Sequence, residues 1–485
     1  MIIGLYIYAI IKLYLILDIY QQSHYYIKPY FKHFIFNILV YDLFPFIILD
    51  IALFFNNIIV QIIASIILIA IAIFHSFLKV KLKFSRRIIR TIILSIIYLF
   101  LFVNKYTYYL LIISEFLLIP LFLLEGLLSK LLNRKYIKKA VKKHKAFNGL
   151  NIAITGSYGK TSTKNLFKDI LNLNHKALAT PKSFNTELGL SSFINNNIID
   201  IYDYLILEFG ASKRKDISKL SYLFKPNIAV VTEVGYMHMD GFKTIENVLK
   251  EKMQIIKNCD IVILNYQNEL IRNYSINNPV VLSYGFNYGD YRALDINDGE
   301  FDFYYKDEFI YHFDTYFIAR HQILNLLAVL AYSHYIGMDL SKIAGLLKTI
   351  KLTEKRLEIR EIGNKVILDD SFNSNFNGFK NALKVLSKYD KKRILITPGI
   401  VELGKYEREI YSVLARHISY SCDIVILVGN REVNNLYKAL KEYDIETFRV
   451  GTFKQAYSMY SKMSNNSALL IENDLPDLYR RGLLF

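Results

Sequence analysis

The chain contains very little cysteine and no tryptophan. Cys259 and Cys422 are the only two cysteines in 485 residues, and both begin the same short run, Cys-Asp-Ile-Val-Ile-Leu. Such an apolar run is typical of a buried strand. Two thiols at strand starts argue against a disulfide framework or a cysteine metal site. Because the same run occurs twice, the sequence predicts two similar α/β layers.

Other features that define large protein classes are missing as well. We find no module of interleaved aromatic and basic residues, so we expect no nucleic-acid partner. Neither a paired Walker B segment nor an exporter signature segment is present, which argues against an ATP-driven transporter. The first apolar segment, 4–19, lacks a basic n-region and a small-residue cleavage site. We therefore expect it to be retained rather than removed as a signal peptide.

Long apolar runs, by contrast, are abundant. Hydrophobic residues make up 53% of the chain, and they dominate its first 130 residues. Residues 59–78 contain no Asp, Glu, Lys or Arg, and a run of about 20 apolar residues can cross a bilayer. Further candidate spans are 4–19, 34–55, 91–103 and 108–128. The sequence therefore predicts a transmembrane region of about five helices at 1–130. The alternative is a buried helical domain.

Two clusters of basic residues stand beside the predicted spans and account for most of the net charge of +17. Their members are Lys79, Lys81, Lys83, Arg86, Arg87 and Arg90, and then Lys130, Arg134, Lys135, Lys138, Lys139, Lys142, Lys143 and Lys145. Because basic loops face the cytoplasm, the clusters predict a multi-pass protein of the cell membrane with its catalytic domains on the cytoplasmic side. We interpret 131–149 as a basic juxtamembrane linker that contacts anionic membrane lipids.

From about residue 150 the pattern changes to short apolar runs separated by longer amphipathic segments. A first set lies at 151–155, 204–208, 228–232 and 261–265, and a second at 365–369, 393–397, 423–428 and 468–471. Buried parallel strands with helical crossovers give this alternation. We therefore predict two doubly wound α/β domains, at 150–356 and at 357–485. Ligands bind such sheets beyond the carboxyl ends of the strands.

The most informative motif follows the first of these strands. Residues 155–161 read Thr-Gly-Ser-Tyr-Gly-Lys-Thr and lead into a helix-like segment that starts at Ser162. The turn presents backbone N–H groups to a phosphate, and those expected to do so belong to Gly156, Ser157, Tyr158 and Gly159. Lys160 would neutralise the anion, the Thr161 hydroxyl can ligate Mg²⁺, and Ser162 at the helix start is expected to bind the nucleotide with them. With its short glycine spacing, this cradle predicts an ATP-dependent ligase.

Further motifs occur in the order found in one enzyme family. They are the cradle at 155–161, the segments 184–189, 207–211 and 234–239, Lys252, the segment 320–325, Arg356, and the segments 369–375 and 401–404. On these residues the chain resembles the Mur ligase family over about 150–485, most closely its D-alanyl-D-alanine-adding members. The resemblance implies peptidoglycan synthesis, in which ATP phosphorylates a carboxylate and an amine attacks the acyl phosphate. The substrates would be a cell-wall peptide precursor, nucleotide- or lipid-linked, and D-alanyl-D-alanine or a similar amine.

The resemblance also implies the catalytic residues, which would be Lys160, Lys252 and His238. Lys160 would hold the β- and γ-phosphates of ATP, and Thr161 would bind the magnesium on the ATP side. Glu208 and His238 would bind a second magnesium near the acyl phosphate. Lys252 matches a lysine that CO₂ carbamylates, and the resulting anion would bridge the metals. Lys250 is close enough that the register is open between the two lysines.

Other residues would bind the nucleotide and the substrates. Gln322 and Asn325 align with adenine-side asparagines of the family, and Arg356 aligns with an arginine that reaches the ATP phosphates. The residues that would bring the C-terminal domain onto the nucleotide and the incoming amine are Asp370, Asn373 and Asn375. Asn185 and Thr186 would contact substrate.

The chain departs from the family pattern at Gln254, Gln322 and Lys355, which replace a glutamate, an asparagine and a glycine, and at 472–477. It also has its apolar region where soluble family members hold a UDP-sugar. Two alternatives stay open, namely a membrane-bound poly-γ-glutamate-type ligase and a non-catalytic ATP-binding scaffold. The second α/β domain speaks against the first alternative. The retained Lys160 and Lys252 speak against the second.

Overall fold

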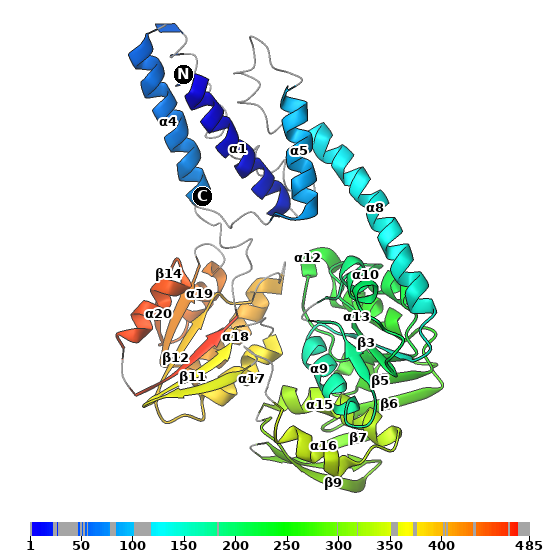
Figure 1. Ribbon diagram of the computed structural model, residues 1–485. Helices are drawn as coiled ribbons and strands as arrows, with labels where there is room; N and C mark the ends of the chain where they lie inside the picture. Colours follow the sequence, from blue (N-terminus) through cyan, green and yellow to red (C-terminus); the bar gives the residue numbers. More distant parts are fainter. Residues whose placement is uncertain are drawn as a thin grey trace. The chain divides into compact units, whose positions relative to one another are not determined.

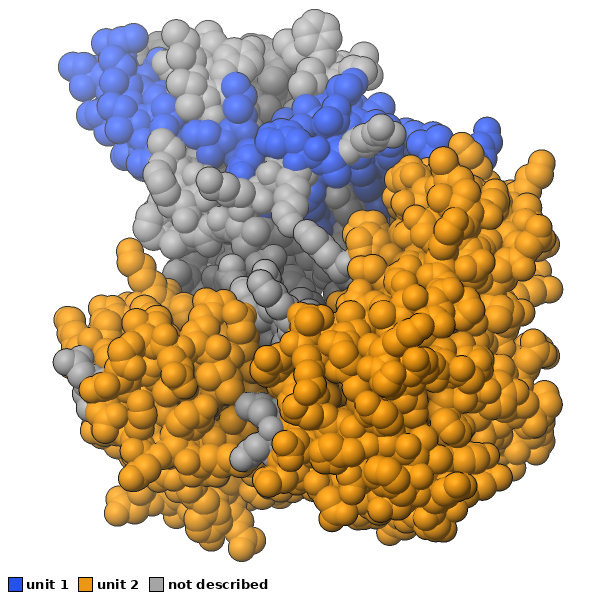
Figure 2. Space-filling model, turned by 60° about the horizontal axis from the view of Figure 1, so that its bottom comes forward, with its two compact units in different colours: residues 1–135, 475–485 blue, residues 136–474 orange. Residues whose placement is uncertain are grey.

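A computed structural model describes residues 2–22, 27, 47, 48, 51, 54, 55, 57–77, 84–100, 118–181, 184–297, 299–317, 319–350, 357–371, 376–400, 403, 406–429, 433–463 and 466–473. The chain divides into two compact units (Figure 2). The first comprises Met1–Lys135 and Leu475–Phe485, and the second comprises Tyr136–Asp474. Each unit is described by itself.

The first unit contains α1 (Ile2–Gln22), α4 (Ile58–Phe77), α5 (Arg86–Phe100) and most of α8 (Ile119–Lys145). Its described core includes Tyr20 and Phe122, whose rings stack with centroids 4.0 Å apart. Beside them lies the buried Glu125 carboxylate, which accepts from Arg87 Nε at 2.6 Å and from Arg90 Nη2 at 3.0 Å. Polar pairing therefore extends into the interior of this unit.

These helices contradict the predicted transmembrane region. Over the residues that can be described, no helix is long and apolar enough to cross a membrane. Residues 91–100 of the run predicted at 91–103 belong to α5, which has 15 described residues and spans about 22 Å at 1.5 Å per residue. α1 carries the buried Lys12 and Asp18.

Two of the predicted spans thus fall in helices that carry charged side chains, α1 with Lys12 and Asp18 and α5 with Arg86, Arg87 and Arg90. The predictions of about five spanning helices and of a multi-pass membrane location are wrong, and so is the membrane part of the predicted fold class. The candidate span at 34–55 lies largely outside the described residues. Of the span at 108–128, only 118–128 is described, and most of that part belongs to α8. The predicted linker, 131–149, is mainly helical because α8 runs to Lys145.

The second unit begins with a nine-stranded sheet of order β2-β3-β1-β4-β5-β6-β7-β8-β9 (Figure 1). The strands are β1 (Leu150–Thr155), β2 (Ala177–Ala179), β3 (Tyr204–Glu208), β4 (Ile228–Val231), β5 (Ile261–Asn265), β6 (Val280–Gly285), β7 (Tyr291–Asn297), β8 (Glu300–Tyr305) and β9 (Glu308–Asp314). The six strands β1 to β6 are parallel to one another, and β7, β8 and β9 form an antiparallel meander. The four runs predicted here as strands correspond to β1, β3, β4 and β5.

Helices cover both faces of this sheet, as a parallel sheet requires. They are α9 (Lys160–Leu171), α10 (Glu187–Asn196), α11 (Asp216–Leu223), α12 (Met239–Phe242), α13 (Ile245–Lys252), the 3₁₀ turn η2 (Met253–Ile256), α14 (Glu269–Arg272), α15 (Arg320–Tyr335) and α16 (Leu340–Leu347). Ile152 and Ile154 of β1 join one core with α9 and α15. Ala153, which points the other way, joins a second core with α10, α11 and α13. Packing on both faces therefore fixes β1, and the predicted phosphate cradle follows the end of this strand.

The C-terminal part holds a six-stranded sheet of order β10-β11-β15-β12-β13-β14, parallel except for β10. Its elements are β10 (Glu358–Ile362), β11 (Lys365–Asp370), α17 (Phe376–Leu386), β12 (Lys392–Thr397), α18 (Glu407–Ser421), β13 (Ile424–Val428), α19 (Asn434–Leu440), β14 (Glu446–Val450), α20 (Phe453–Ser461) and β15 (Ser467–Glu472). Cys259 and Cys422 lie just before β5 and β13 as buried free thiols. This confirms the prediction that the two cysteines stand at the starts of buried strands.

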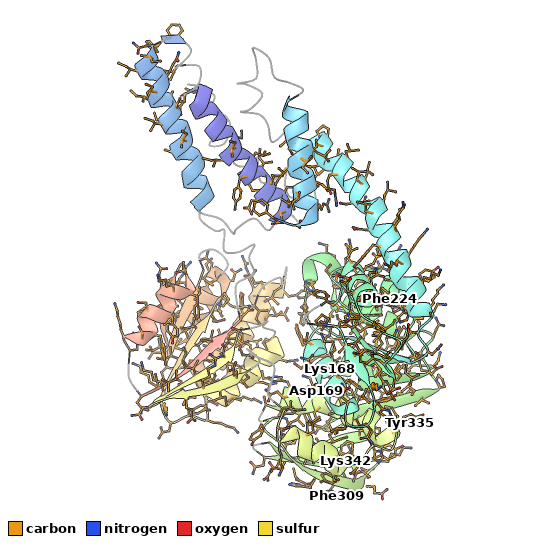
Figure 3. All side chains as sticks on the ribbon, in the orientation of Figure 1. Lys168, Asp169, Phe224, Phe309, Tyr335 and Lys342 are labelled. Carbon is orange, nitrogen blue, oxygen red and sulfur yellow. The ribbon has the colours of Figure 1, made fainter. Side chains whose placement is uncertain are left out.

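His144, near the end of α8, is expected to make stability depend on pH. Its Nε2 lies 3.0 Å from Asn151 Nδ2, and the ring of Phe224 (labelled in Figure 3) meets it edge-on. Burial lowers the pKa of His144 from 6.5 to about 4. The unfolded chain therefore takes up this proton first, so the stabilisation is complete above pH 6.5 and is lost as the pH falls towards 4. The loss amounts to about 2–3 kcal/mol.

Urea unfolding of the full chain at pH 7.5 and 4.5, followed by tyrosine fluorescence, measures this effect. We expect the free energy of unfolding to fall less between the two pH values in His144→Gln than in the wild type. Equal falls in the two proteins would show that His144 does not carry the pH dependence.

Candidate active site

The predicted phosphate cradle is a tight turn between β1 and α9. Gly159 precedes the first residue of α9 with φ of 80°, a conformation that favours glycine. A Cβ atom built there would lie 2.3 Å from Asn325 Oδ1, so α15 approaches the turn closely. Lys160 Nζ donates to the carbonyl oxygens of Gly156 at 2.7 Å and Ser157 at 3.2 Å. The ammonium group thus lies over the turn, beside the N–H groups that start α9.

The segment after β4 holds the other side of the cradle. Ser157 Oγ accepts from the N–H of Gly235 at 3.1 Å, and Tyr158 Oη donates to the carbonyl of Tyr236 at 2.6 Å. Thr232 donates to the carbonyl of Tyr158. Burial, and secondarily the charge of Glu233, raises the pKa of the Tyr158 phenol, so this group stays a neutral donor. The polar side chains of the turn therefore fix its shape. The backbone N–H of Ser157, which was expected to face a phosphate, donates to the carbonyl of Glu233 at 2.6 Å instead.

A buried carboxylate lies at the end of β3. Glu208 is 1% exposed, and its Oε2 accepts from Thr161 Oγ1 at 2.9 Å and from Lys164 Nζ at 3.1 Å. Its Oε1 accepts from Asn185 Nδ2 at 3.1 Å. Three residues predicted from separate motifs thus meet at one point. Lys164, which sequence reasoning missed, lies on the same face of α9 as Lys160 because the two are four residues apart.

The donor atoms at this point fit Mg²⁺. The Thr161 hydroxyl and the Glu208 carboxylate are oxygen ligands, which this hard cation prefers. Throughout the described part of the chain, no group of three or more His, Cys, Asp and Glu side chains is arranged to hold a metal ion. A magnesium held by one carboxylate, one hydroxyl and the phosphates of a nucleotide needs no such group. His238 is half-buried at the start of α12 with φ of 53°, and its pairing with Glu208 stays a prediction.

Lys252 is the last residue of α13 and is 3% exposed, whereas Lys250 is exposed. Burial lowers the pKa of the Lys252 amine well below its usual value, and the charge of Lys160 lowers it further against the opposing effect of Glu251. The two lysines that could match the carbamylated lysine of the family therefore have different surroundings. Lys252 is held in a place that favours the neutral, nucleophilic amine, and Lys250 is solvated.

Glu251 anchors the end of α13 and thereby positions Lys252. It is 6% exposed, and it accepts from the backbone N–H groups of Lys215 at 2.7 Å and Ile217 at 2.8 Å, where α11 begins. We expect Glu251→Gln to lower the free energy of unfolding by about 1–3 kcal/mol, because the amide keeps only one of two acceptors. Urea unfolding beside Glu246→Gln, an exposed position on the same helix, provides the comparison. Equal effects of the two variants would rule out the anchoring role.

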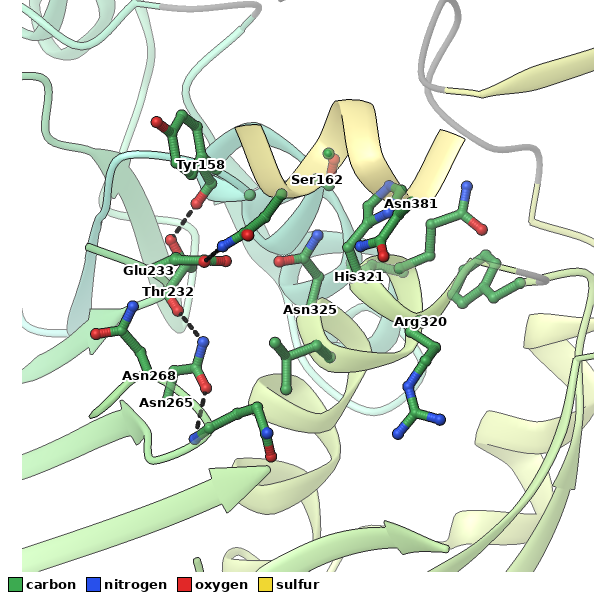
Figure 4. Close-up of a pocket in the computed structure, with 18 of the residues that line it drawn as sticks. Tyr158, Ser162, Thr232, Glu233, Asn265, Asn268, Arg320, His321, Asn325 and Asn381 are labelled. Carbon is green, nitrogen blue, oxygen red and sulfur yellow. Dashed lines mark hydrogen bonds between the residues drawn. The ribbon is translucent and has the colours of Figure 1, made fainter. Parts of the chain in front are cut away.

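A cavity of about 680 Å³ opens beside the cradle, between the carboxyl ends of β4 and β5, α15 and α17 (Figure 4). The predicted residues that line it are Tyr158, Gly159, Ser162, Gln322, Asn325 and Asp370. Sequence reasoning missed other lining residues, among them Phe286 and Arg320, whose guanidinium lies 4.4 Å from the ring centroid of Phe286. An aromatic ring, a cation and several amides suit a planar polar base with a charged tail.

The two sheets contribute jointly to this cavity. Asn377 of α17 donates to Glu233 Oε1 at 2.9 Å, and burial raises the pKa of the Glu233 carboxyl against that hydrogen bond. Asn265, the last residue of β5, and Asn268, three residues later, donate to the carbonyl oxygens of Thr232 and Val234, respectively. They lie at the carboxyl edge of the sheet, where ligands of such sheets bind. Their position at the end of a predicted strand is the sequence feature that could have identified them.

Some predicted residues have other observed contacts or cannot be placed. Thr186 Oγ1 accepts from Gly189 N at 3.2 Å and caps α10, and Gln322 Oε1 accepts from Ala319 N at 3.2 Å at the start of α15. Their contacts with substrate and adenine stay predictions. Arg356, Asn373 and Asn375 lie outside the described residues.

Comparison with known proteins gives consistent matches over both sheets. Residues 154–333 match the Mur ligase middle domain, and residues 355–472 match the Mur ligase, glutamate ligase domain. The UDP-N-acetylmuramoyl-tripeptide–D-alanyl-D-alanine ligase of Borreliella burgdorferi is 31% identical over 292 residues, 57% of this chain and 62% of that protein. The ligase of the same name from Rickettsia prowazekii is 32% identical over 309 residues, 60% and 68% of the two chains. The chain thus spans less than two thirds of the Borreliella protein's length.

Solved structures share the fold. MurF ligase from Thermotoga maritima, solved in complex with ADP, superposes with a TM-score of 0.64 at 24% identity and covers 72% of this chain and 82% of its own. A pseudomurein peptide ligase type C from Methanothermus fervidus gives 0.55 at 16% identity, with 69% and 78% covered. At these identities the likeness is one of fold.

Proposed function

This chain belongs to the Mur ligase family, and we propose that it joins D-alanyl-D-alanine, or a similar amine, to the carboxylate of a muramoyl-tripeptide in peptidoglycan precursor synthesis. The names of its relatives support this substrate pair. The observation that carries the proposal is the meeting of Thr161 and Glu208, 2.9 Å apart, at the start of α9 beside a cavity of about 680 Å³. ATP and magnesium are the expected reactants at such a point.

The reaction we propose has two steps. The substrate carboxylate oxygen takes the γ-phosphoryl group of ATP, and the bond from that phosphorus to ADP breaks. The amine then attacks the acyl carbon, loses a proton, and expels inorganic phosphate to leave an amide. Lys160 and the N–H groups of the turn neutralise the charge of the phosphates, and residues of α17 close the cavity against water. Mg²⁺, when bound at Thr161 and Glu208, supplies further positive charge to the phosphates.

Lys252 would act as a carbamate. Its neutral amine adds to CO₂ and releases one proton, which converts a potential cation into an anion. Two mutually repelling lysines, Lys160 and Lys252, then become an attractive pair. The carbamate, with Glu208 and His238, would serve a second magnesium.

We assign the middle domain to 150–356 and the C-terminal domain to 357–485. Asn325, Gln322 and Arg356 are proposed to bind the nucleotide, together with Asp370. Asn185 and Thr186 are proposed to contact the carboxylate substrate, and Asn373 and Asn375 the amine.

The experiment uses the purified full chain with ATP, Mg²⁺, bicarbonate, UDP-N-acetylmuramoyl-tripeptide and D-alanyl-D-alanine. We expect one phosphate released per product molecule, with the product mass of the dipeptide adduct. Turnover only with a lipid-linked muramoyl-peptide would keep the ligase and change its acceptor. No ATP turnover with either acceptor would reject the proposal.

A further inference from the structure

The Glu208 carboxylate already has a buried cation as its partner. The side chain of Lys164 is 0% exposed, that of Glu208 is 1% exposed, and their N and O atoms are 3.1 Å apart. The same Oε2 atom accepts from Thr161, and Oε1 accepts from Asn185. The pair carries no net charge, and solvent screens it little because both groups are buried. A divalent cation at Oε2 would therefore lie beside a buried ammonium group.

The surrounding charges reinforce this. Lys160 lies on the same face of α9, four residues before Lys164, so a second lysine stands on the side of the helix that meets the carboxylate. Two lysines beside a single carboxylate attract a polyphosphate and disfavour a divalent cation that arrives without one.

We propose that Lys164 keeps divalent cations off Glu208 until a nucleoside triphosphate occupies the cradle, so that metal and nucleotide bind together. The inference rests on the proposed function in taking Glu208 as a metal ligand. Lys164 is a positioning residue here, because it acts through the Glu208 carboxylate. Its positive charge, rather than its bulk, sets the order of binding.

Manganese binding by the full chain, followed by electron paramagnetic resonance, tests this order. The wild type should bind Mn²⁺ weakly alone and at least tenfold more tightly with a non-hydrolysable ATP analogue. Lys164→Met should bind Mn²⁺ at least tenfold more tightly than the wild type without nucleotide, because the buried carboxylate then lacks its partner. Lys164→Arg should behave as the wild type. Lys164→Met combined with Glu208→Gln should lose the gain, which places the new site at Glu208.

Thermal unfolding gives a second readout, which remains usable if Lys164→Met is less stable than the wild type. Mg²⁺ without nucleotide should raise the melting temperature of Lys164→Met and leave those of the wild type and the double variant unchanged. Tight Mn²⁺ binding by the nucleotide-free wild type, or equal affinities of the wild type and Lys164→Met, would overturn the inference. Neither measurement uses the carboxylate or the amine substrate, so a failed ligase assay and a failed metal result are told apart.

Discussion

Replacing Lys160 by alanine is expected to lower kcat for product formation by about 10³-fold. The Lys160 ammonium lies over the turn, 2.7 Å from the Gly156 carbonyl, where the phosphates of ATP would be bound. A preorganised positive charge at this place stabilises the charge that develops on the transferring phosphoryl group. Phosphate release and product mass at saturating ATP, tripeptide precursor and dipeptide measure the loss.

Lys176→Ala serves as the matched control, because Lys176 is exposed just after α9 and should keep the wild-type rate. Lys160 is half-buried and donates to two carbonyls of the turn, so the melting temperature of Lys160→Ala, measured beside that of the wild type, separates a loss of catalysis from a loss of folding. A variant that retains more than about a tenth of the wild-type kcat would contradict the role of Lys160.

The cradle could be predicted from sequence because it is local. A strand, a glycine turn, a lysine and a helix lie within a few residues, and each has its own physical requirement. Glu208 was indicated by its place at the end of a predicted strand as well as by the family motifs, whereas Asn185 was placed at the site only through those motifs. Their contacts with α9 could not be predicted, since β3 and the start of α10 reach α9 by tertiary folding. Lys164 was missed because a lysine on an amphipathic helix is normally solvated, and only the carboxylate arriving from β3 explains its burial.

The membrane prediction failed for a related reason. Composition records how many apolar residues a segment holds, but not where one helix ends or which charges the folded chain buries. Glu125 illustrates this, since Arg87 and Arg90 pair with it inside the first unit. The cavity residues Phe286 and Asn377 were equally out of reach, because they come from separate elements around two sheets.

Replacing Lys252 by alanine is expected to lower kcat by about 10²–10³-fold, an effect of the size seen when a preorganised charged group is removed. The structure buries this amine and places it near the Lys160 charge, both of which favour its neutral form. Only the neutral amine adds to CO₂, so the environment promotes the carbamate at neutral pH. With ¹³C-labelled bicarbonate, the wild type should give a carbamate carbon resonance that is absent from Lys252→Ala.

Lys250→Ala is the matched control two residues away, because Lys250 is exposed on the same helix. It should keep both the resonance and the wild-type rate. A short carboxylic acid added to Lys252→Ala should restore part of kcat, because it returns a negative charge to the cavity left by the side chain, while Lys250→Ala should not respond. If Lys252→Ala lost the resonance and kept its activity, the carbamate would have no part in catalysis. If both variants lost activity equally, the loss would come from α13 as a whole, and burial of Lys252 would not be the property that matters.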